Sequence, residues 1–165
     1  MAHVTNSNLY SIDAGTSDFS GACVVLVRTE WNASIVDELE RGARSVLEQY
    51  GVKLVETIAV PGAVEIPFAI RSRFQSSSFL KADAFVALGC VIRGDTPHFD
   101  YVCQSVTDGI TQLNLNLTAP VIMGILTVEN QQQAEDRIGG RHGHKGEEAA
   151  LTALKMIALN RYFNK

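Results

Sequence analysis

The chain has 165 residues, of which 46% are hydrophobic and 19% are charged, so it is long enough for one globular domain with a substantial core. Its 14 Lys and Arg residues and 18 Asp and Glu residues give a formal net charge of −4 at pH 7. This balance argues against a general nucleic-acid surface or an anionic-membrane surface. No apolar stretch is long enough to span a bilayer, and residues 1–6 lack the pattern of a secretory signal.

We therefore expect a single domain over residues 1–165, with residues 1–20 as a polar N-terminal arm in which 8–10 is the one candidate short strand. The chain has three cysteines, an odd number without C-x-x-C spacing, and each lies in an apolar strand or helix pattern. Cys23, Cys90 and Cys103 are therefore predicted to be buried thiols in a reducing compartment, and a cytoplasmic location is expected.

Strand and helix patterns alternate along the chain. An apolar, β-branched strand at 22–27 precedes a helix that Asn32 or Ser34 caps and that Gly51 ends. The later elements are expected as a strand at 54–60, a helix around 66–74, a strand at 83–88, a helix from Pro97, a strand at 121–127, a short helix at 131–137, a glycine-rich loop at 139–146 and a final helix around 150–158. Apolar strands separated by helices predict an α/β fold with a parallel sheet covered on both sides.

The stretch G-C-V-I-R-G-D-T-P-H-F-D-Y at 89–101 leads from a strand directly into a helix. Thr96 is predicted to cap this helix, and Pro97 suits its first position, where no backbone N–H is needed. The free N–H groups of the helix then face Gly94, Asp95 and Thr96, an arrangement that favours an anion such as phosphate. His98 lies in the first turn, where an imidazole is either a proton shuttle or a solvated polar residue.

Ligands of parallel sheets bind beyond the carboxyl ends of the strands, so the turns at these ends form the candidate site. Trp31 is the only tryptophan and follows the first strand, where it either offers a flat face to a planar ring or fills the end of the core. After the second strand, Gly62, Ala63 and Val64 bring small residues and N–H groups suited to a ring carbonyl. Glu65 there is either a site residue or a favourable charge near a helix N-terminus.

Basic residues gather between positions 137 and 145, which indicates either a solvated face or an anion site. The planar fork of Arg137 suits bidentate phosphate binding. His142 and His144 are weak evidence for a metal, because no cysteine or carboxylate completes a ligand set at usable spacing. Neither a P-loop nor a G-x-G-x-x-G motif is present, so a nucleoside triphosphate or a dinucleotide is not indicated.

Five segments, in matching order and spacing, closely resemble the 6,7-dimethyl-8-ribityllumazine synthase family. They are V-P-G-A-V-E-I-P at 60–67, G-C-V-I-R-G-D-T-P-H-F-D-Y-V at 89–102, G-I-L-T-V-E-N at 124–130, Q-A-E-D-R at 133–137 and H-K-G at 144–146. The likeness covers about residues 8–162. It implies a flavodoxin-like three-layer α/β/α domain with a four-stranded parallel sheet, assembled as pentamers or as twelve pentamers in an icosahedral shell.

The resemblance implies a transferase that condenses 5-amino-6-(ribitylamino)uracil with 3,4-dihydroxy-2-butanone 4-phosphate, releasing phosphate and water, with no cofactor or metal. It assigns His98 as the proposed acid/base. The substrate-binding positions are the ring-stacking Trp31, where Phe is more usual, with its companion Asn32; Ala63, Val64 and Glu65 at the ribityl chain; Cys90, Val91 and Ile92 at the pyrimidine; Gly94, Asp95 and Thr96 at the phosphate; Arg137 from the neighbouring subunit; and Lys145 near the same pocket.

Two positions depart from the family pattern. Met123 stands where many members have an aromatic residue covering the site, and its polarisable thioether can still cover a ring. His144 replaces the usual Asn of N-K-G. The loop after Arg137 has no long insertion, which resembles shell-forming members.

Three other functions are considered. A signalling receiver needs an acidic cluster with a phosphorylatable Asp after the first strand, which Arg28-Thr29-Glu30 does not provide. A related riboflavin synthase would share the fold but dismutate lumazine. A non-catalytic flavin-binding shell protein would bind riboflavin without releasing phosphate.

Overall fold

A computed structural model describes residues 8–9, 18–77 and 80–164. Its main sheet has four parallel strands in the order β2-β1-β3-β4. They are β1 (Cys23–Thr29), β2 (Leu54–Val60), β3 (Ala84–Ile92) and β4 (Val121–Val128). The parallel sheet predicted from the sequence is thus confirmed. Of the strand expected at 8–10, Tyr10 lies outside the described residues, and Asn8 and Leu9 form a bend and a turn.

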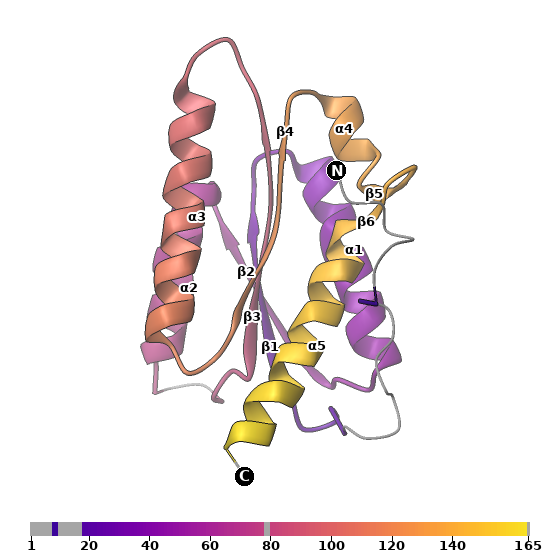
Figure 1. Cartoon of the computed structure of the whole chain (residues 1–165), viewed down its shortest axis with the longest axis vertical. Coiled ribbons are helices and arrows are strands. Elements are labelled where there is room, and N and C mark those ends of the chain that lie inside the picture. Colours follow the sequence, from indigo (N-terminus) through magenta and orange to yellow (C-terminus); the bar gives the residue numbers. More distant parts are fainter. Residues whose placement is uncertain (1–7, 10–17, 78–79, 165) are drawn as a thin grey trace.

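Helices cover both faces of this sheet (Figure 1). One face packs against α1 (Ala33–Gln49) and α5 (Lys145–Phe163), and the other packs against α2 (Ile66–Gln75) and α3 (His98–Asn116). The central strands β1 and β3 are almost entirely buried, because the side chains that alternate along them enter one core or the other. These two cores make the three-layer α/β/α arrangement.

The strand β3 is longer than the sequence predicted, since it continues through Gly89 to Ile92 instead of ending at residue 88. Its pairing with β4 extends over the same residues, from Gly89 opposite Ile125 to Ile92 opposite Val128. The backbone ladder therefore carries the strand past the glycine. This extension brings Cys90, Val91 and Ile92 to the carboxyl edge of the sheet.

The start of α3 also differs from the prediction. The helix begins at His98, Pro97 is its N-cap with φ −66°, and no side chain caps it. The expected cap by the Thr96 hydroxyl is therefore wrong. Proline at the cap fixes the backbone in the helical φ range, so the helix begins without that hydrogen bond.

The segment expected as a short helix and a loop has more structure than predicted. The helix α4 (Gln131–Glu135) ends two residues early, and the loop contains an antiparallel hairpin, β5 (Ile138–Gly140) paired with β6 (Gly143–His144). Gly139 and Gly143 adopt φ values of 107° and 80°, which side chains disfavour. These glycines turn the chain back, and α5 begins directly after the hairpin.

The three cysteines are free, and two of them are buried as predicted. Cys103 is only partly buried, because α3 turns that position towards the surface of its layer. Among the helices of the described ranges, none is both long and apolar enough to cross a bilayer.

Candidate active site

A cavity of about 550 Å³ opens at the carboxyl ends of β1 and β3, beside the 3₁₀ turn η2 (Ala63–Glu65) and the first turns of α3. We call it the Trp31 cavity. It is lined by Thr29, Trp31, Asn32, Gly62, Ala63, Val64, Glu65, Cys90, Val91, Ile92, His98 and Val102. The volume lies within the range of small-molecule sites. One chain thus brings together the residues predicted for ring stacking, ribityl binding, pyrimidine binding and proton transfer, whereas Thr29 and Val102 were not foreseen.

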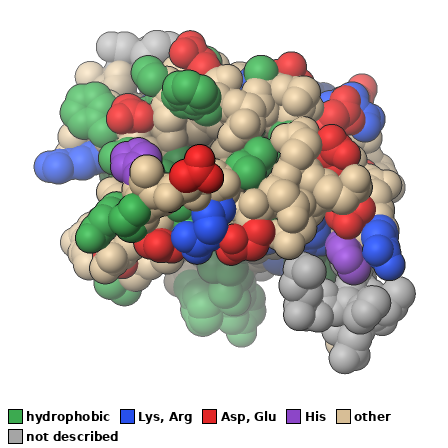
Figure 2. All heavy atoms as spheres, turned by 90° about the horizontal axis from the view of Figure 1, so that it is seen from above, with side chains coloured by type: hydrophobic (Ala, Val, Ile, Leu, Met, Phe, Trp, Pro, Cys, Tyr) green, Lys and Arg blue, Asp and Glu red, His purple; other side chains and the backbone are tan. Residues whose placement is uncertain are grey.

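The side chain of Trp31 remains 74% exposed beside this cavity. The alternative that it fills the end of the core is therefore wrong for this chain. An exposed indole next to a cavity offers a free face to a planar ligand. Figure 2 views this end of the molecule and shows hydrophobic side chains gathered mainly on its left half, the side of α2 and α3.

The turn that carries Trp31 is fixed by hydrogen bonds to two neighbouring strands. The Glu30 N–H donates to the Val60 carbonyl at 2.9 Å, and the Asn32 amide donates to the Cys90 carbonyl at 2.8 Å. Asn32 has φ 56°, a left-handed conformation that asparagine tolerates better than most residues. Asn32 is the N-cap residue of α1, one of the two that the sequence predicted, but its side chain makes no capping hydrogen bond and instead joins the β1–α1 turn to the end of β3.

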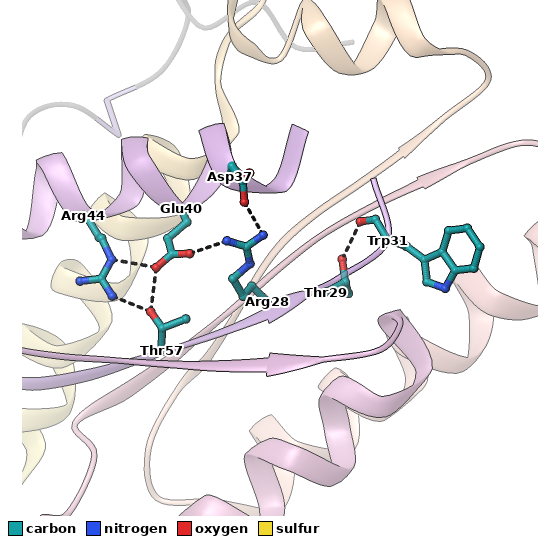
Figure 3. A network of polar contacts seen from close by, with 7 residues as sticks. All are labelled: Arg28, Thr29, Trp31, Asp37, Glu40, Arg44 and Thr57. Carbon is teal, nitrogen blue, oxygen red and sulfur yellow. Dashed lines mark hydrogen bonds and ion pairs between the residues drawn. The ribbon is translucent and has the colours of Figure 1, made fainter. Parts of the chain in front are cut away.

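An ion-pair network anchors the same turn from the other side (Figure 3). Arg28 of β1 pairs with Asp37 and Glu40 of α1, and Glu40 also accepts from Arg44 and from the Thr57 hydroxyl of β2, both at 2.8 Å. Burial alone would raise the pKa of Glu40, but the hydrogen bonds from Arg44, Thr57 and Arg28 outweigh it and lower the pKa. The carboxylate therefore stays charged and ties α1 to both strands.

Arg93 organises the turn on the other side of the cavity, and the sequence had not singled it out. Its guanidinium pairs with Asp100 of α3 at 2.9 Å and with Glu129 after β4 at 2.8 Å. It also lies 4.1 Å from the ring centroid of Phe99. The hydrogen bond from Arg93 lowers the pKa of Asp100.

The ion pairs of Arg93 join the ends of β3 and β4 to the start of α3. They surround the turn predicted to bind phosphate, Gly94, Asp95 and Thr96, which is exposed. His98 follows this turn as the first residue of α3 and lines the Trp31 cavity. The turn and the imidazole are therefore adjacent, as the sequence predicted.

Burial raises the pKa of the Cys90 thiol to about 11. The group is therefore a protonated thiol at neutral pH, and a thiol is a poor nucleophile. Cys90 lines the cavity and supplies the carbonyl that holds Asn32. Among the residues described, no three His, Cys, Asp or Glu side chains are grouped as a metal site.

The remaining predicted residues lie elsewhere in the same chain. Arg137 and Lys145 line a second cavity of about 270 Å³ beside α4 and the hairpin, which we call the Arg137 cavity. Met123 and Lys145 line a third cavity, of about 350 Å³, between β4 and α5. None of these three side chains lines the Trp31 cavity.

Arg137 has a carboxylate partner that the sequence did not reveal. Its Nη1 and Nη2 atoms donate to the two oxygens of Glu148 at 2.9 and 2.8 Å, and Nη1 also donates to the His142 carbonyl. Lys145 lies 3.9 Å from the same carboxylate. Glu148 lies in the first turn of α5, a position where an acidic residue is favourable in any helix, so this contact had no distinct sequence signal.

These features define an α/β protein with a preformed cavity, of the size of small-molecule sites, at the carboxyl edge of its parallel sheet. The model of a protein family described as 6,7-dimethyl-8-ribityllumazine synthase matches residues 21–161, and the chain belongs to this family. It is 52% identical over 134 residues to the 6,7-dimethyl-8-ribityllumazine synthase of Porphyromonas gingivalis, covering 80% of this chain and 81% of the relative. The protein of that name from Parabacteroides distasonis is 48% identical over 142 residues, covering 85% and 87%.

We predict that Trp31 reports ligand binding. Riboflavin, a planar probe with a ribityl chain, should saturably quench the emission of this single tryptophan, because its ring stacks on the exposed indole. Trp31→Ala should weaken binding, measured by calorimetry, by about 1–3 kcal/mol, whereas Trp31→Phe should retain most of it. Riboflavin binding that leaves the emission unchanged would contradict a stacking role.

We also predict that two substitutions of Asn32 differ in stability. Asn32→Gly removes the bond to Cys90 but accepts φ 56°, so it should lower the free energy of unfolding by about 1 kcal/mol. Asn32→Ala also places an unsuited residue in the left-handed region and should cost about 1 kcal/mol more. Urea unfolding measures both values. Equal losses would show that the backbone conformation contributes nothing.

Proposed function

We propose that this chain is a 6,7-dimethyl-8-ribityllumazine synthase that condenses 5-amino-6-(ribitylamino)uracil with 3,4-dihydroxy-2-butanone 4-phosphate, releasing phosphate and water. One observation carries the proposal. The residues that the family resemblance assigns to the pyrimidine, its ribityl chain and the proton transfer line one cavity, although they come from three separate segments of the chain. Membership of the family supports the same reaction.

The reaction needs a clamp for a planar ring, a cradle for phosphate and a group that moves protons. In this proposal Trp31 stacks on the pyrimidine, the turn Gly94–Thr96 binds the phosphate, and His98 transfers protons as the amine adds to the ketone and the second amine closes the ring. No nucleophile, metal or cofactor is required. Holding the two reactants together supplies much of the rate, since effective molarities reach about 10⁵ M or more in favourable cases.

We further propose that the complete site forms between copies of the chain, in a pentamer or a shell of twelve pentamers. Arg137, Lys145 and Met123 lie away from the Trp31 cavity of their own chain, so a neighbouring copy is the natural source of these groups. Nη1 and Nη2 of Arg137 donate to the Glu148 carboxylate. In this proposal the phosphate therefore approaches the guanidinium from the side of Nε. The free cysteines fit a cytoplasmic location.

The direct test is an assay of the purified chain with both substrates, following lumazine absorbance and released phosphate. Formation of both products supports the proposal. A riboflavin synthase would instead convert lumazine supplied alone, and a non-catalytic flavin-binding protein would release no phosphate. Family membership favours neither alternative.

We predict that His98→Ala lowers turnover without abolishing it. This variant still holds the two substrates together, and water can move the protons in place of the imidazole. We therefore expect kcat to fall by at most about 10²–10⁴-fold with little change in KM. Steady-state kinetics with each substrate varied in turn measures both constants. A KM effect that exceeds the kcat effect would make His98 a binding residue.

Arg137→Ala should have the opposite signature. The variant loses a charge-assisted contact worth about 1.5–3 kcal/mol, so the KM for the phosphate substrate should rise about tenfold or more while that for the pyrimidine barely changes. Equal changes in both KM values, or none, would place the phosphate on the Gly94 turn and Lys145 alone.

We predict that the active form is an oligomer whose sites mix residues of different copies. Light scattering at assay concentrations should show that the active protein is an oligomer and not a monomer. Trp31→Ala and Arg137→Ala chains, refolded together in equal amounts, should regain activity, because about a quarter of the mixed sites then combine a native cavity with a native arginine. Each variant refolded alone is the control. The absence of recovery in a proven mixed oligomer would place the whole site in one chain.

A further inference from the structure

His144 is a buried histidine at the junction between the hairpin and α5. It is only 5% exposed, it pairs with Ile138 as the last residue of β6, and it is the N-cap of α5. The Glu147 N–H donates to its Nδ1 atom at 3.4 Å. The imidazole thus performs the capping role that a shorter polar side chain usually has.

The ring fits at this place because α1 has a glycine opposite it. A Cβ atom on Gly42 would lie 2.2 Å from Cε1 of His144, so no other residue fits there without displacing the ring. The two helices also approach closely at a second place, since a Cβ on Gly146 of α5 would lie 2.0 Å from the carbonyl oxygen of Leu39 in α1. The start of α5 is therefore held against α1, with the imidazole wedged between the helix and the hairpin.

The hydrogen bond fixes the tautomer of His144. Because Nδ1 accepts from Glu147, the proton of the neutral ring is on Nε2. Nε2 is the one buried side-chain polar atom without a hydrogen-bond partner in the part of the chain described. A second proton would go to Nδ1, where it would face the Glu147 N–H and end the cap. Only the neutral ring can therefore hold the start of α5 in this way.

The charges around the ring come from two helices. Glu38 and Arg41 on α1 and Glu147 on α5 act on it, whereas its hairpin neighbours Ile138 and Gly139 are uncharged. Burial lowers the pKa of His144 and outweighs the opposing effect of the two carboxylates. The stability that the neutral ring contributes is therefore fully present at pH values above about 6.5, the ordinary pKa of a histidine, and is lost as the pH falls below it.

The basic residues of the Arg137 cavity are attached to the segment that His144 holds. The Lys145 N–H donates to the Arg137 carbonyl at 2.7 Å, and the guanidinium of Arg137 is paired with Glu148. Lys145 and Glu148 are the first and fourth residues of α5. The position of the first turn of this helix therefore sets the positions of both cations.

We propose that neutral His144, wedged against Gly42, is a positioning residue that holds Arg137 and Lys145 in place for a divalent oxyanion. The proposal rests on the function proposed above, in which that oxyanion is the substrate phosphate. Protonation of His144 releases the first turn of α5 and weakens oxyanion binding. Affinity at this site therefore falls as the pH drops through the lowered pKa of His144, which lies below the ordinary value of about 6.5, for a reason separate from the titration of the ligand.

Sulfate is the probe, because it stays divalent across the range and a phosphate ester does not. In calorimetric titrations of the assembled protein from pH 8 down to about pH 5, the sulfate Kd of the wild type should stay constant to about pH 6.5 and rise several-fold only below it, because the pKa of His144 lies under that ordinary value. His144→Asn can accept the Glu147 N–H but cannot titrate, so its Kd should match the wild type at pH 8 and change much less on acidification. His98 and His142 remain in both proteins, so the difference isolates His144.

Two further variants test the wedge itself. Gly42→Ala should displace the ring and raise the sulfate Kd about tenfold at pH 8, and Gly42→Ala/His144→Ser should recover the affinity, because serine caps without a ring. Unfolding curves and light scattering establish that each variant is folded and assembled. If Gly42→Ala does not fold, the double variant replaces it in the comparison.

Retention of the wild-type pH dependence in His144→Asn would overturn the proposal. So would a Gly42→Ala protein that loses stability but binds sulfate as the wild type does, since His144 would then be merely structural. Sulfate binding that Arg137→Ala leaves unchanged would overturn it as well. These measurements need no turnover, so a chain that forms no lumazine but shows the sulfate pattern would refute the proposed function alone.

Discussion

The reversal of strand order between β1 and β3 is the constraint on which the site depends. The chain moves from β1 to β2 on one side and then crosses to β3 on the other, so the connections that leave β1 and β3 diverge at the carboxyl edge of the sheet. Such a switch point leaves a crevice between the diverging turns. The Trp31 cavity lies there, between the turn after β1 and the end of β3.

Polar contacts tie the elements around this crevice to one another without any ligand. Asn32 joins the β1–α1 turn to β3, Arg28 joins β1 to α1, and Arg93 joins β3 to α3 and to the segment after β4. Each guanidinium is matched by two carboxylates, so the charges hold elements together and do not form an anion site of their own. Such tied walls suit the reaction proposed above, in which much of the rate comes from holding two reactive molecules together.

The sequence predicted most of the sheet and most of the Trp31 cavity, because both follow local rules. Apolar runs mark the strands, and the carboxyl ends of parallel strands must meet at one edge, which unites Trp31, Ala63 and His98. The missed features depend on contacts between distant segments. No periodicity links Gly42 to His144 or Arg137 to Glu148, and the expected Thr96 cap is absent because proline alone starts α3.

The pairing of Arg137 with Glu148 is consistent with a site completed by another copy of the chain. An arginine that waited alone for phosphate would lose side-chain entropy on binding and would repel Lys145 beforehand. Glu148 orients the fork in advance and balances the neighbouring ammonium, at the cost of reducing the net positive charge that an anion meets. In the shared site proposed above, selectivity then depends on placing two cations accurately, and the proposal makes that placement depend on the first turn of α5, where His144 meets Gly42.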